Sequence, residues 1–117
     1  MNIKEKVILV TGGTSGIGEA CGRHFAALGA RVVVASNQRD RGAAIEKELL
    51  AAGHEARFVF ADVSREESVQ AMVERAVEHY GRIDGVHCNA GVWGKGKVTE
   101  FNDSEWDRIM SVNVKSV

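Results

Sequence analysis

The sequence has no proline, only two cysteines and a single tyrosine among 117 residues. Without proline, a repeat or a low-complexity segment, nothing marks a linker to a second domain, and the length allows one domain with a modest core. Cys21 and Cys88 fit no metal-ligand spacing, so no metal site is predicted. Both fall on apolar patterns and are expected to be buried thiols in a reducing cytoplasm.

Long apolar runs and blocks of one charge are also missing. Charged residues make up 26% of the chain, yet the net charge is only −1. No basic block indicates nucleic-acid binding, and no apolar run reaches the length of a membrane span. The first residues also lack the apolar core of a secretory signal. We therefore expect a soluble globular protein with neither nucleic-acid nor membrane partners.

Short apolar runs alternate with helical patterns along the chain. Strands are predicted over residues 6–11, 31–35, 56–61 and 83–88. Helices are predicted over residues 16–28 and 39–52, from a capping box Ser64-x-x-Glu67 to Gly81, and after a cap at Asn102 or Asp103. Apolar strands that alternate with helices indicate an α/β fold, a Rossmann-type doubly wound parallel sheet with four strands in the order 3-2-1-4.

The helical patterns also predict which side chains face the core. On the first helix these are Ile17, Ala20, Cys21, Phe25 and Leu28, and on the second Ala43, Ile45 and Leu49. On the third helix they include Met72, Ala76 and Tyr80, and on the last Trp106, Ile109, Met110, Val114 and Val117. Because the last helix still carries its apolar side at its end, the domain of residues 1–117 is expected to be incomplete at its C-terminus.

A glycine-rich segment, Thr11-Gly12-Gly13-Thr14-Ser15-Gly16-Ile17-Gly18, joins the first strand to the first helix. Glycines allow a tight turn and a close approach of the backbone to a phosphate, and the helix N-terminus attracts an anion. No Lys-Ser or Lys-Thr follows, so a Walker-type site is not predicted. A purely structural turn is the alternative. The candidate binding residues here are Gly12, Thr14, Ser15, Gly16, Ile17 and Gly18.

The carboxyl ends of parallel strands meet at one edge of a sheet, so the residues that follow the other strands should join this segment in one cleft. They are Ser36 and Asn37, Asp62 and Val63, and Asn89, Ala90 and Gly91. Asp62 is expected to bond an adenine ring, or else to satisfy the N–H groups of its own loop. Small residues at Asn89–Gly91 would let a cofactor sugar lie against the backbone, although they also suit a plain turn.

Ser36 stands about twenty residues after Gly16, where a ribose-binding acid is expected in dinucleotide sites. A neutral residue there does not repel a 2′-phosphate, and Arg39 and Arg41 follow within reach of one. This favours NADP slightly over NAD. The alternative is that both arginines are solvated residues at the start of a helix.

Asn113 falls four residues after Ile109, on the apolar face of the last helix. A buried amide needs hydrogen-bond partners, which can be backbone groups or a water near the cleft. A structural asparagine with its hydrogen bonds satisfied is the alternative, and the spacing alone slightly favours it.

Four motifs together resemble the N-terminal part of a short-chain dehydrogenase/reductase: Thr11-Gly12-x-x-x-Gly16-x-Gly18, Asp62-Val63, Asn89-Ala90-Gly91 and Asn113. The resemblance implies a Rossmann fold, NADP or NAD as cofactor, and hydride transfer between a nicotinamide and a small alcohol or ketone. It further implies that Asn113 belongs to a catalytic tetrad and relays protons through a water, and that the protein is a homo-oligomer.

The sequence departs from the family pattern at three places. The family's catalytic serine and Tyr-x-x-x-Lys pair have no counterpart, since the one tyrosine, Tyr80, is followed four residues later by Asp84. Ser36 and Asn37 leave the cofactor open, and Cys88 stands where the family often has a second asparagine. An alternative function is therefore a non-enzymatic nucleotide-binding or interaction module built on half a Rossmann fold.

Overall fold

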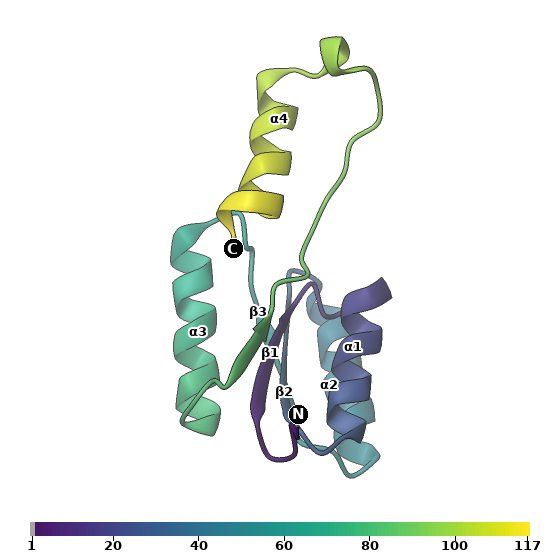
Figure 1. Cartoon of the computed structure of the whole chain (residues 1–117), viewed down its shortest axis with the longest axis vertical. Helices are drawn as coiled ribbons and strands as arrows, with labels where there is room; N and C mark the ends of the chain where they lie inside the picture. Colours follow the sequence, from purple (N-terminus) through teal and green to yellow (C-terminus); the bar gives the residue numbers. More distant parts are fainter. Residues whose placement is uncertain (1) are drawn as a thin grey trace.

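The computed structural model describes residues 2–117, which form a four-stranded parallel sheet with helices on both faces (Figure 1). The elements in chain order are β1 (Val7–Thr11), α1 (Gly16–Ala27), β2 (Arg31–Ser36), α2 (Arg39–Ala51), β3 (Ala56–Phe60), α3 (Glu66–Tyr80), β4 (Gly85–His87), a 3₁₀ turn (Val98–Glu100), α4 (Asp103–Met110) and a π-helical turn (Ser111–Lys115). The strand order β3-β2-β1-β4 confirms the predicted doubly wound topology.

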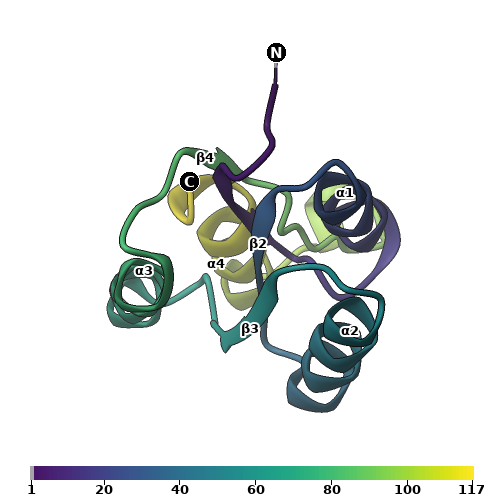
Figure 2. The ribbon, with the colours of Figure 1, turned by 90° about the horizontal axis from the view of Figure 1, so that it is seen from below.

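Two layers of apolar side chains hold the sheet between its helices. Seen along the strands, α3 covers one face while α1 and α2 cover the other (Figure 2). Side chains alternate between the two faces of a strand, so Leu9 and Val33 pack with Met72 of α3, whereas Val34 packs with Ile45 of α2. Because both faces are buried, the central strands are apolar throughout, and the sheet forms a rigid platform for the loops at its edge.

The buried face of α1 differs from the prediction. Gly18, Gly22 and Ala26 face the sheet, while Ile17 is 74% exposed and Leu28 is 51% exposed. Small residues bring the helix close to the strands, since a Cβ on Gly22 would lie only 3.8 Å from Val32. Ile17 and Leu28 are thereby turned outward and Ala20 is exposed with them, whereas Phe25 is half-buried and packs against the core as predicted.

The same effect operates on α2. Gly42 is buried against the Phe58 ring, where a Cβ would lie 2.1 Å from a ring carbon, while Ala43, predicted to face the core, is exposed. Ile45 and Leu49 are buried as predicted.

The predicted capping box is wrong. Helix α3 begins at Glu66, and its N-cap residue, Arg65, makes no side-chain cap bond. Ser64 Oγ instead donates to Asp62 Oδ1 at 2.6 Å, so a turn within the loop takes the hydroxyl that the helix was expected to use. Tyr80 packs against the core as predicted, and burial raises the pKa of its phenol.

The two cysteines are less buried than predicted. Cys21 is half-buried on α1, and Cys88 is exposed. Strand β4 spans three residues rather than the predicted six, and among the described residues only β1 pairs with it. Cys88 therefore lies beyond the strand and outside the protected centre of the sheet.

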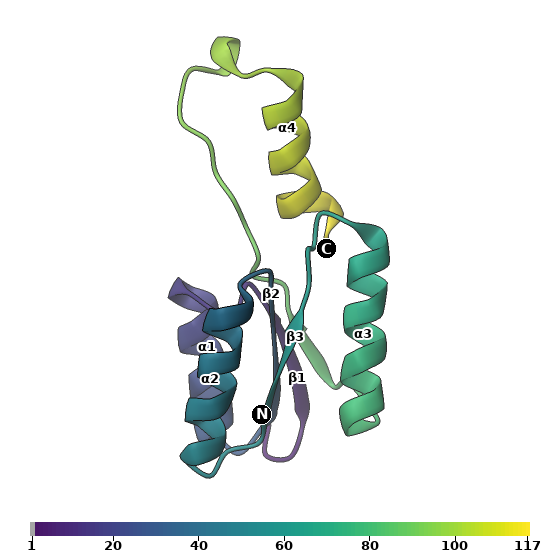
Figure 3. The same ribbon diagram turned by 180° about the vertical axis from the view of Figure 1, so that it is seen from behind.

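Helix α4 extends past the carboxyl edge of the sheet and is joined to β4 by a long open segment (Figures 1 and 3). Asn102 caps it, its Oδ1 accepting from Glu105 N at 2.8 Å, as one of the two predicted caps. Its apolar side is largely uncovered, with Trp106 57% exposed on α4 and Val114 58% exposed on the π-helical turn that continues it. Within residues 2–117, no helix has the length and apolar content needed to cross a membrane.

Candidate functional site

A cleft of about 290 Å³ lies at the carboxyl edge of the sheet, where the sequence places the strand ends together. Every strand contributes to it through the residues that follow its last paired position, and the start of the π-helical turn adds one more. Its lining residues are Gly12, Thr14, Ser15, Ser36, Asn37, Gln38, Ala61, Asp62, Val63, Ala90, Gly91, Val92 and Val112. The predicted convergence of the four strand ends is thus observed.

The glycine-rich segment is shaped by contacts that only glycine allows. Gly12 has φ +64°, and a Cβ there would lie 2.9 Å from Ala90 Cα. A Cβ on Gly18 would lie 2.2 Å from the Gly12 oxygen and 2.4 Å from Asn89 Nδ2. By contrast, Gly16 has φ +52° with no atom near its missing side chain. The segment is therefore tightly packed against the protein at Gly12 and Gly18, whereas the space beside Gly16 is open. A ligand-binding loop needs both features.

Helix α1 presents its N-terminus at this cleft. Its N-cap, Ser15, lines the cleft in an extended conformation and makes no side-chain cap bond, so no side chain satisfies the first N–H groups of the helix. Uncapped N–H groups and the positive end of the helix dipole suit an anion. Together with the open side of the glycine segment, they fit the pyrophosphate of a dinucleotide.

Thr11 and Asn89 join the glycine segment to the end of β4. Thr11 Oγ1 accepts hydrogen bonds from the backbone N–H groups of Asn89 and Ala90, both at 3.1 Å. Asn89 Nδ2 donates to the carbonyl oxygens of Thr11 at 3.1 Å and Gly12 at 3.2 Å. Asn89 therefore stands behind the cleft and supports it rather than lining it.

A second polar contact links the glycine segment to β2. The hydroxyls of Thr14 and Ser36, both buried, lie 2.7 Å apart, and Ser36 Oγ also accepts from Gln38 N at 3.1 Å. At the end of β2, the side chain that lines the cleft is therefore neutral, and its hydroxyl is already hydrogen-bonded. Gln38 was missed by sequence reasoning, although its place directly after Asn37 on the same loop could have indicated it.

Asp62 serves its own loop while lining the cleft. Its Oδ1 accepts from Ser64 N at 3.1 Å and from Ser64 Oγ, and its backbone N–H donates to Ser68 Oγ at 2.9 Å. The two interpretations of Asp62 are therefore compatible, because the carboxylate fixes the loop that brings Asp62 and Val63 to the cleft.

Several predicted residues lie outside the lining of the cleft: Gly16, Ile17, Gly18, Arg39 and Asn89. Arg39 places its guanidinium over the Phe60 ring, 3.9 Å from the ring centroid. Arg41 Nη2 donates to Glu19 Oε1 at 2.6 Å.

Asn113 holds the segment that leaves the cleft. Its Oδ1 accepts from Val92 N at 2.7 Å, and its Nδ2 donates to Val92 O at 2.8 Å. Both side-chain atoms are therefore satisfied by backbone, as the structural alternative expected. The neighbouring Val112 lines the cleft directly, and neither it nor Val92 was predicted.

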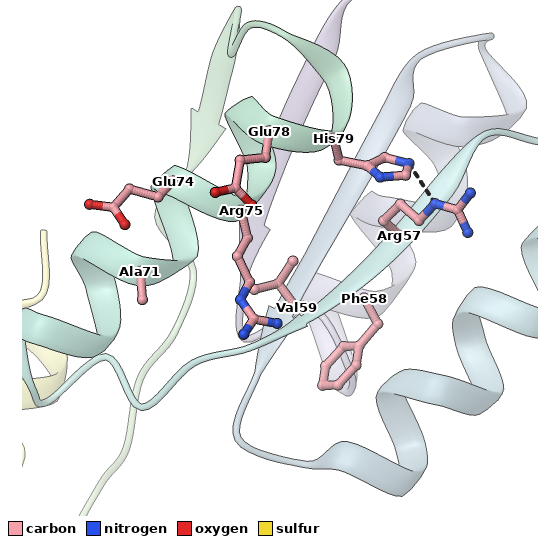
Figure 4. A pocket seen from close by; sticks show the side chains of 8 residues that line it. All are labelled: Arg57, Phe58, Val59, Ala71, Glu74, Arg75, Glu78 and His79. Atoms are coloured by element: carbon pink, nitrogen blue, oxygen red, sulfur yellow. Dashed lines mark hydrogen bonds between the residues drawn. The ribbon is translucent and has the colours of Figure 1, made fainter.

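A larger groove of about 590 Å³ lies between β3 and α3 and contains none of the predicted residues (Figure 4). Half of its lining residues are charged, and Arg57 Nε donates to His79 Nε2 at 2.6 Å across it. It has no glycine cradle and no helix N-terminus among its lining residues. Across residues 2–117, no group of three or more His, Cys, Asp or Glu side chains is placed to hold a metal. The cleft at the sheet edge is therefore the candidate site.

Comparison with known proteins places this geometry among its relatives. The short chain dehydrogenase family model matches residues 6–117. An uncharacterised oxidoreductase of Listeria innocua is 36% identical over 117 residues, which cover 100% of this chain and 47% of the relative. The chain thus spans about half the length of the curated relatives it matches.

Two solved structures show the likeness in three dimensions. A short-chain dehydrogenase/reductase of Burkholderia phymatum, solved with NAD, superimposes with a TM-score of 0.96 at 34% identity, covering 99% of this chain and 41% of that one. A metagenomic short-chain oxidoreductase, solved with NADP, gives a TM-score of 0.91 at 35% identity, covering 99% and 53%.

Proposed function

This chain belongs to the short-chain dehydrogenase family, and from that premise we propose that residues 1–117 form the dinucleotide-binding domain of an NAD(P)-dependent oxidoreductase acting on a small alcohol or ketone. The cleft shared by all four strand ends is the observation that carries the proposal, because it combines an open glycine cradle with an uncapped helix N-terminus. Relatives solved with NAD and with NADP support a nicotinamide cofactor.

Different residues of the cleft would bind different parts of the cofactor. Gly12, Thr14, Ser15 and the open helix N-terminus that follows them would bind the pyrophosphate, Asp62 and Val63 the adenine, and Ser36, Asn37, Ala90 and Gly91 the riboses. Gly18 and Asn89 would support these residues from behind. When bound, the nicotinamide supplies or accepts the hydride. The chain itself contributes orientation, and the tight support behind Gly12 and Gly18 keeps that orientation fixed.

Asn113 is the residue of this part of the protein that we propose contributes to catalysis, through positioning. Its amide grips the Val92 backbone through two bonds, which fixes the segment that follows Gly91 at the mouth of the cleft. We therefore assign it a positioning role in proton relay, since an amide does not itself titrate.

NADP is the cofactor we favour. Ser36 offers no carboxylate to repel a 2′-phosphate, and stacking on Phe60 leaves the in-plane donors of Arg39 free. We also place the protein in the cytoplasm as a homo-oligomer, with the exposed apolar side of α4 as its contact surface. Light scattering of the wild type and Met110→Lys tests the assembly, and the variant should have the smaller mass.

A charge placed at Ser15 tests the binding function. Ser15→Glu puts a carboxylate at the N-cap, where it would repel a pyrophosphate but stabilise the helix. The isosteric but neutral Ser15→Gln is the matched control. By titration calorimetry the wild type and Ser15→Gln should bind NADP or NAD with one site, and Ser15→Glu should bind at least about tenfold more weakly. Failure of the folded wild type to bind either nucleotide would overturn the proposal.

A further inference from the structure

The first turn of α2 carries two arginines, of which one is paired with a carboxylate and the other is not. Arg41 Nη2 lies 2.6 Å from Glu19 Oε1, across the gap between α2 and α1. Arg39 stacks on Phe60 and makes no ion pair with any of residues 2–117. Of these two cations next to the cleft, Arg39 alone keeps an uncompensated charge.

Glu19 is the centre of a neutral ion network. Besides Arg41, its carboxylate accepts from Arg23 Nε at 2.8 Å, and Arg23 Nη2 in turn donates to Glu48 Oε2 at 2.5 Å. The Glu19 side chain is 17% exposed, so these contacts are partly shielded from water. The hydrogen bond from Arg23, together with Arg41, holds the pKa of Glu19 below its usual range. An anion that approached Arg41 would have to displace a carboxylate already in contact.

The ion network lies close to the part of the cleft where NADP and NAD would be distinguished. Helix α2 begins directly after Gln38, which lines the cleft with Ser36 and Asn37. NADP differs from NAD only in its 2′-phosphate, so discrimination depends on the charges around the end of β2. Ser36 is neutral and its hydroxyl is already bonded, so the charged groups at this place are Arg39, Asp40 and Arg41 in the first turn of α2 and Asp62 after β3, and the two arginines are the cations among them.

Building on the proposed function, we propose that Glu19 is a specificity-determining residue. By holding Arg41 against α1, it leaves Arg39 as the one cation available to a 2′-phosphate and so keeps the affinities for NADP and NAD close together. Glu19 acts through Arg41 and is not among the residues that line the cleft.

Titration calorimetry of the 117-residue chain with NADP and with NAD measures the ratio of the two affinities. Glu19→Gln removes the negative charge that holds Arg41 and should raise the preference for NADP about tenfold, the scale of one charge-assisted hydrogen bond. Adding Arg41→Ala to Glu19→Gln should restore the wild-type ratio. Glu48→Gln breaks the far end of the network without touching Arg41 and should leave the ratio unchanged.

Arg41→Ala in the wild-type background gives a second test that does not depend on the folding of Glu19→Gln. Because Arg41 is already held by Glu19, its loss should leave NADP affinity within about twofold. An unchanged ratio in folded Glu19→Gln, or a large loss in Arg41→Ala, would overturn the inference while nucleotide binding itself stood. If the folded wild type bound neither nucleotide, the proposed function and this inference would fall together.

Discussion

The two halves of the molecule are held together by different means. In the first, from β1 to β3, buried glycines and apolar strands fix the cradle at contact distance, and Gly18 and Gly22 bring α1 onto the sheet. In the second, after Gly91, large apolar side chains stand in solvent, with Trp93 72% and Val98 79% exposed. Packing therefore shapes the nucleotide cradle, whereas side-chain hydrogen bonds to the backbone place the segment beside it.

Breaking the packed half should have the largest effect. Gly18→Ala puts a Cβ 2.2 Å from the Gly12 oxygen, an overlap with backbone that cannot be relieved by a rotamer change, so we expect a loss of about 3 kcal/mol or more. Gly22→Ala is the matched control on the same helix face, because its Cβ meets Val32 at an ordinary 3.8 Å. It should change stability by about 1 kcal/mol at most, since alanine also favours the helix. Urea unfolding measures both, and equal losses would contradict the packing argument.

Most of the packed half could be predicted from the sequence. Buried parallel strands are mostly apolar, so the apolar runs within residues 31–35 and 56–61 are conspicuous, and the topology then brings Gly12, Ser36 and Asp62 to one edge. The rotation of α1 could not be predicted in this way. Glycine and alanine carry almost no hydropathy signal, so the pattern was assigned to Ile17 and Leu28 instead of Gly18 and Gly22.

The second half was less predictable because local hydrogen bonds compete with one another there. The same holds before it, in the loop after β3, where Ser64 was expected to cap α3 but its hydroxyl donates to Asp62 instead. Asn113 was recognised by its position on an apolar face, yet its partner, the Val92 backbone, lies 21 residues away and has no sequence signal. The lining residues Val92 and Val112 were missed for the same reason.

The next effect concerns the hydrogen bonds between Thr11 and the residues that follow β4. Thr11→Val keeps the shape of the side chain but removes the oxygen that accepts from Asn89 N and Ala90 N. Two N–H groups near the core are then left without a partner, at an expected loss of about 1–3 kcal/mol. Thr11→Ser retains the oxygen and gives up only a methyl group, which costs about 1 kcal/mol. If the serine variant proved the less stable of the two in urea, this contact would depend on packing and not on hydrogen bonds.

A smaller and more local effect is expected in the second half itself. Asn113→Ala removes both bonds to the Val92 backbone, which are exposed, so the free energy of unfolding should fall by about 1 kcal/mol or less. Hydrogen exchange should nevertheless quicken across residues 91–117 while β1 and β2 stay protected. Asn113→Asp keeps the oxygen that accepts from Val92 N but loses the donor to Val92 O. Its exchange rates should lie between those of the wild type and those of Asn113→Ala. Equal quickening in β1 would show that the halves are not independent.

The smallest effect is expected at the surface of the packed half, from the ionisation of Glu19. Its folded pKa is held below the usual 4.5 by the hydrogen bond from Arg23 and by Arg41, against a penalty from burial. A lowered folded pKa gives stability that is present above the unfolded pKa and lost as the pH falls through the folded one.

Because the network is partly exposed, Glu19→Gln should cost about 1 kcal/mol or less at pH 7. In urea titrations the difference from wild type should therefore shrink as the pH falls below 4.5 and disappear once the pH lies below the folded pKa of Glu19. Glu74→Gln removes a carboxylate that has no ion pair in residues 2–117, and it should cost less stability at pH 7 than Glu19→Gln. A difference for Glu19→Gln that persisted in acid would mean that shape, and not charge, joins α1 to α2.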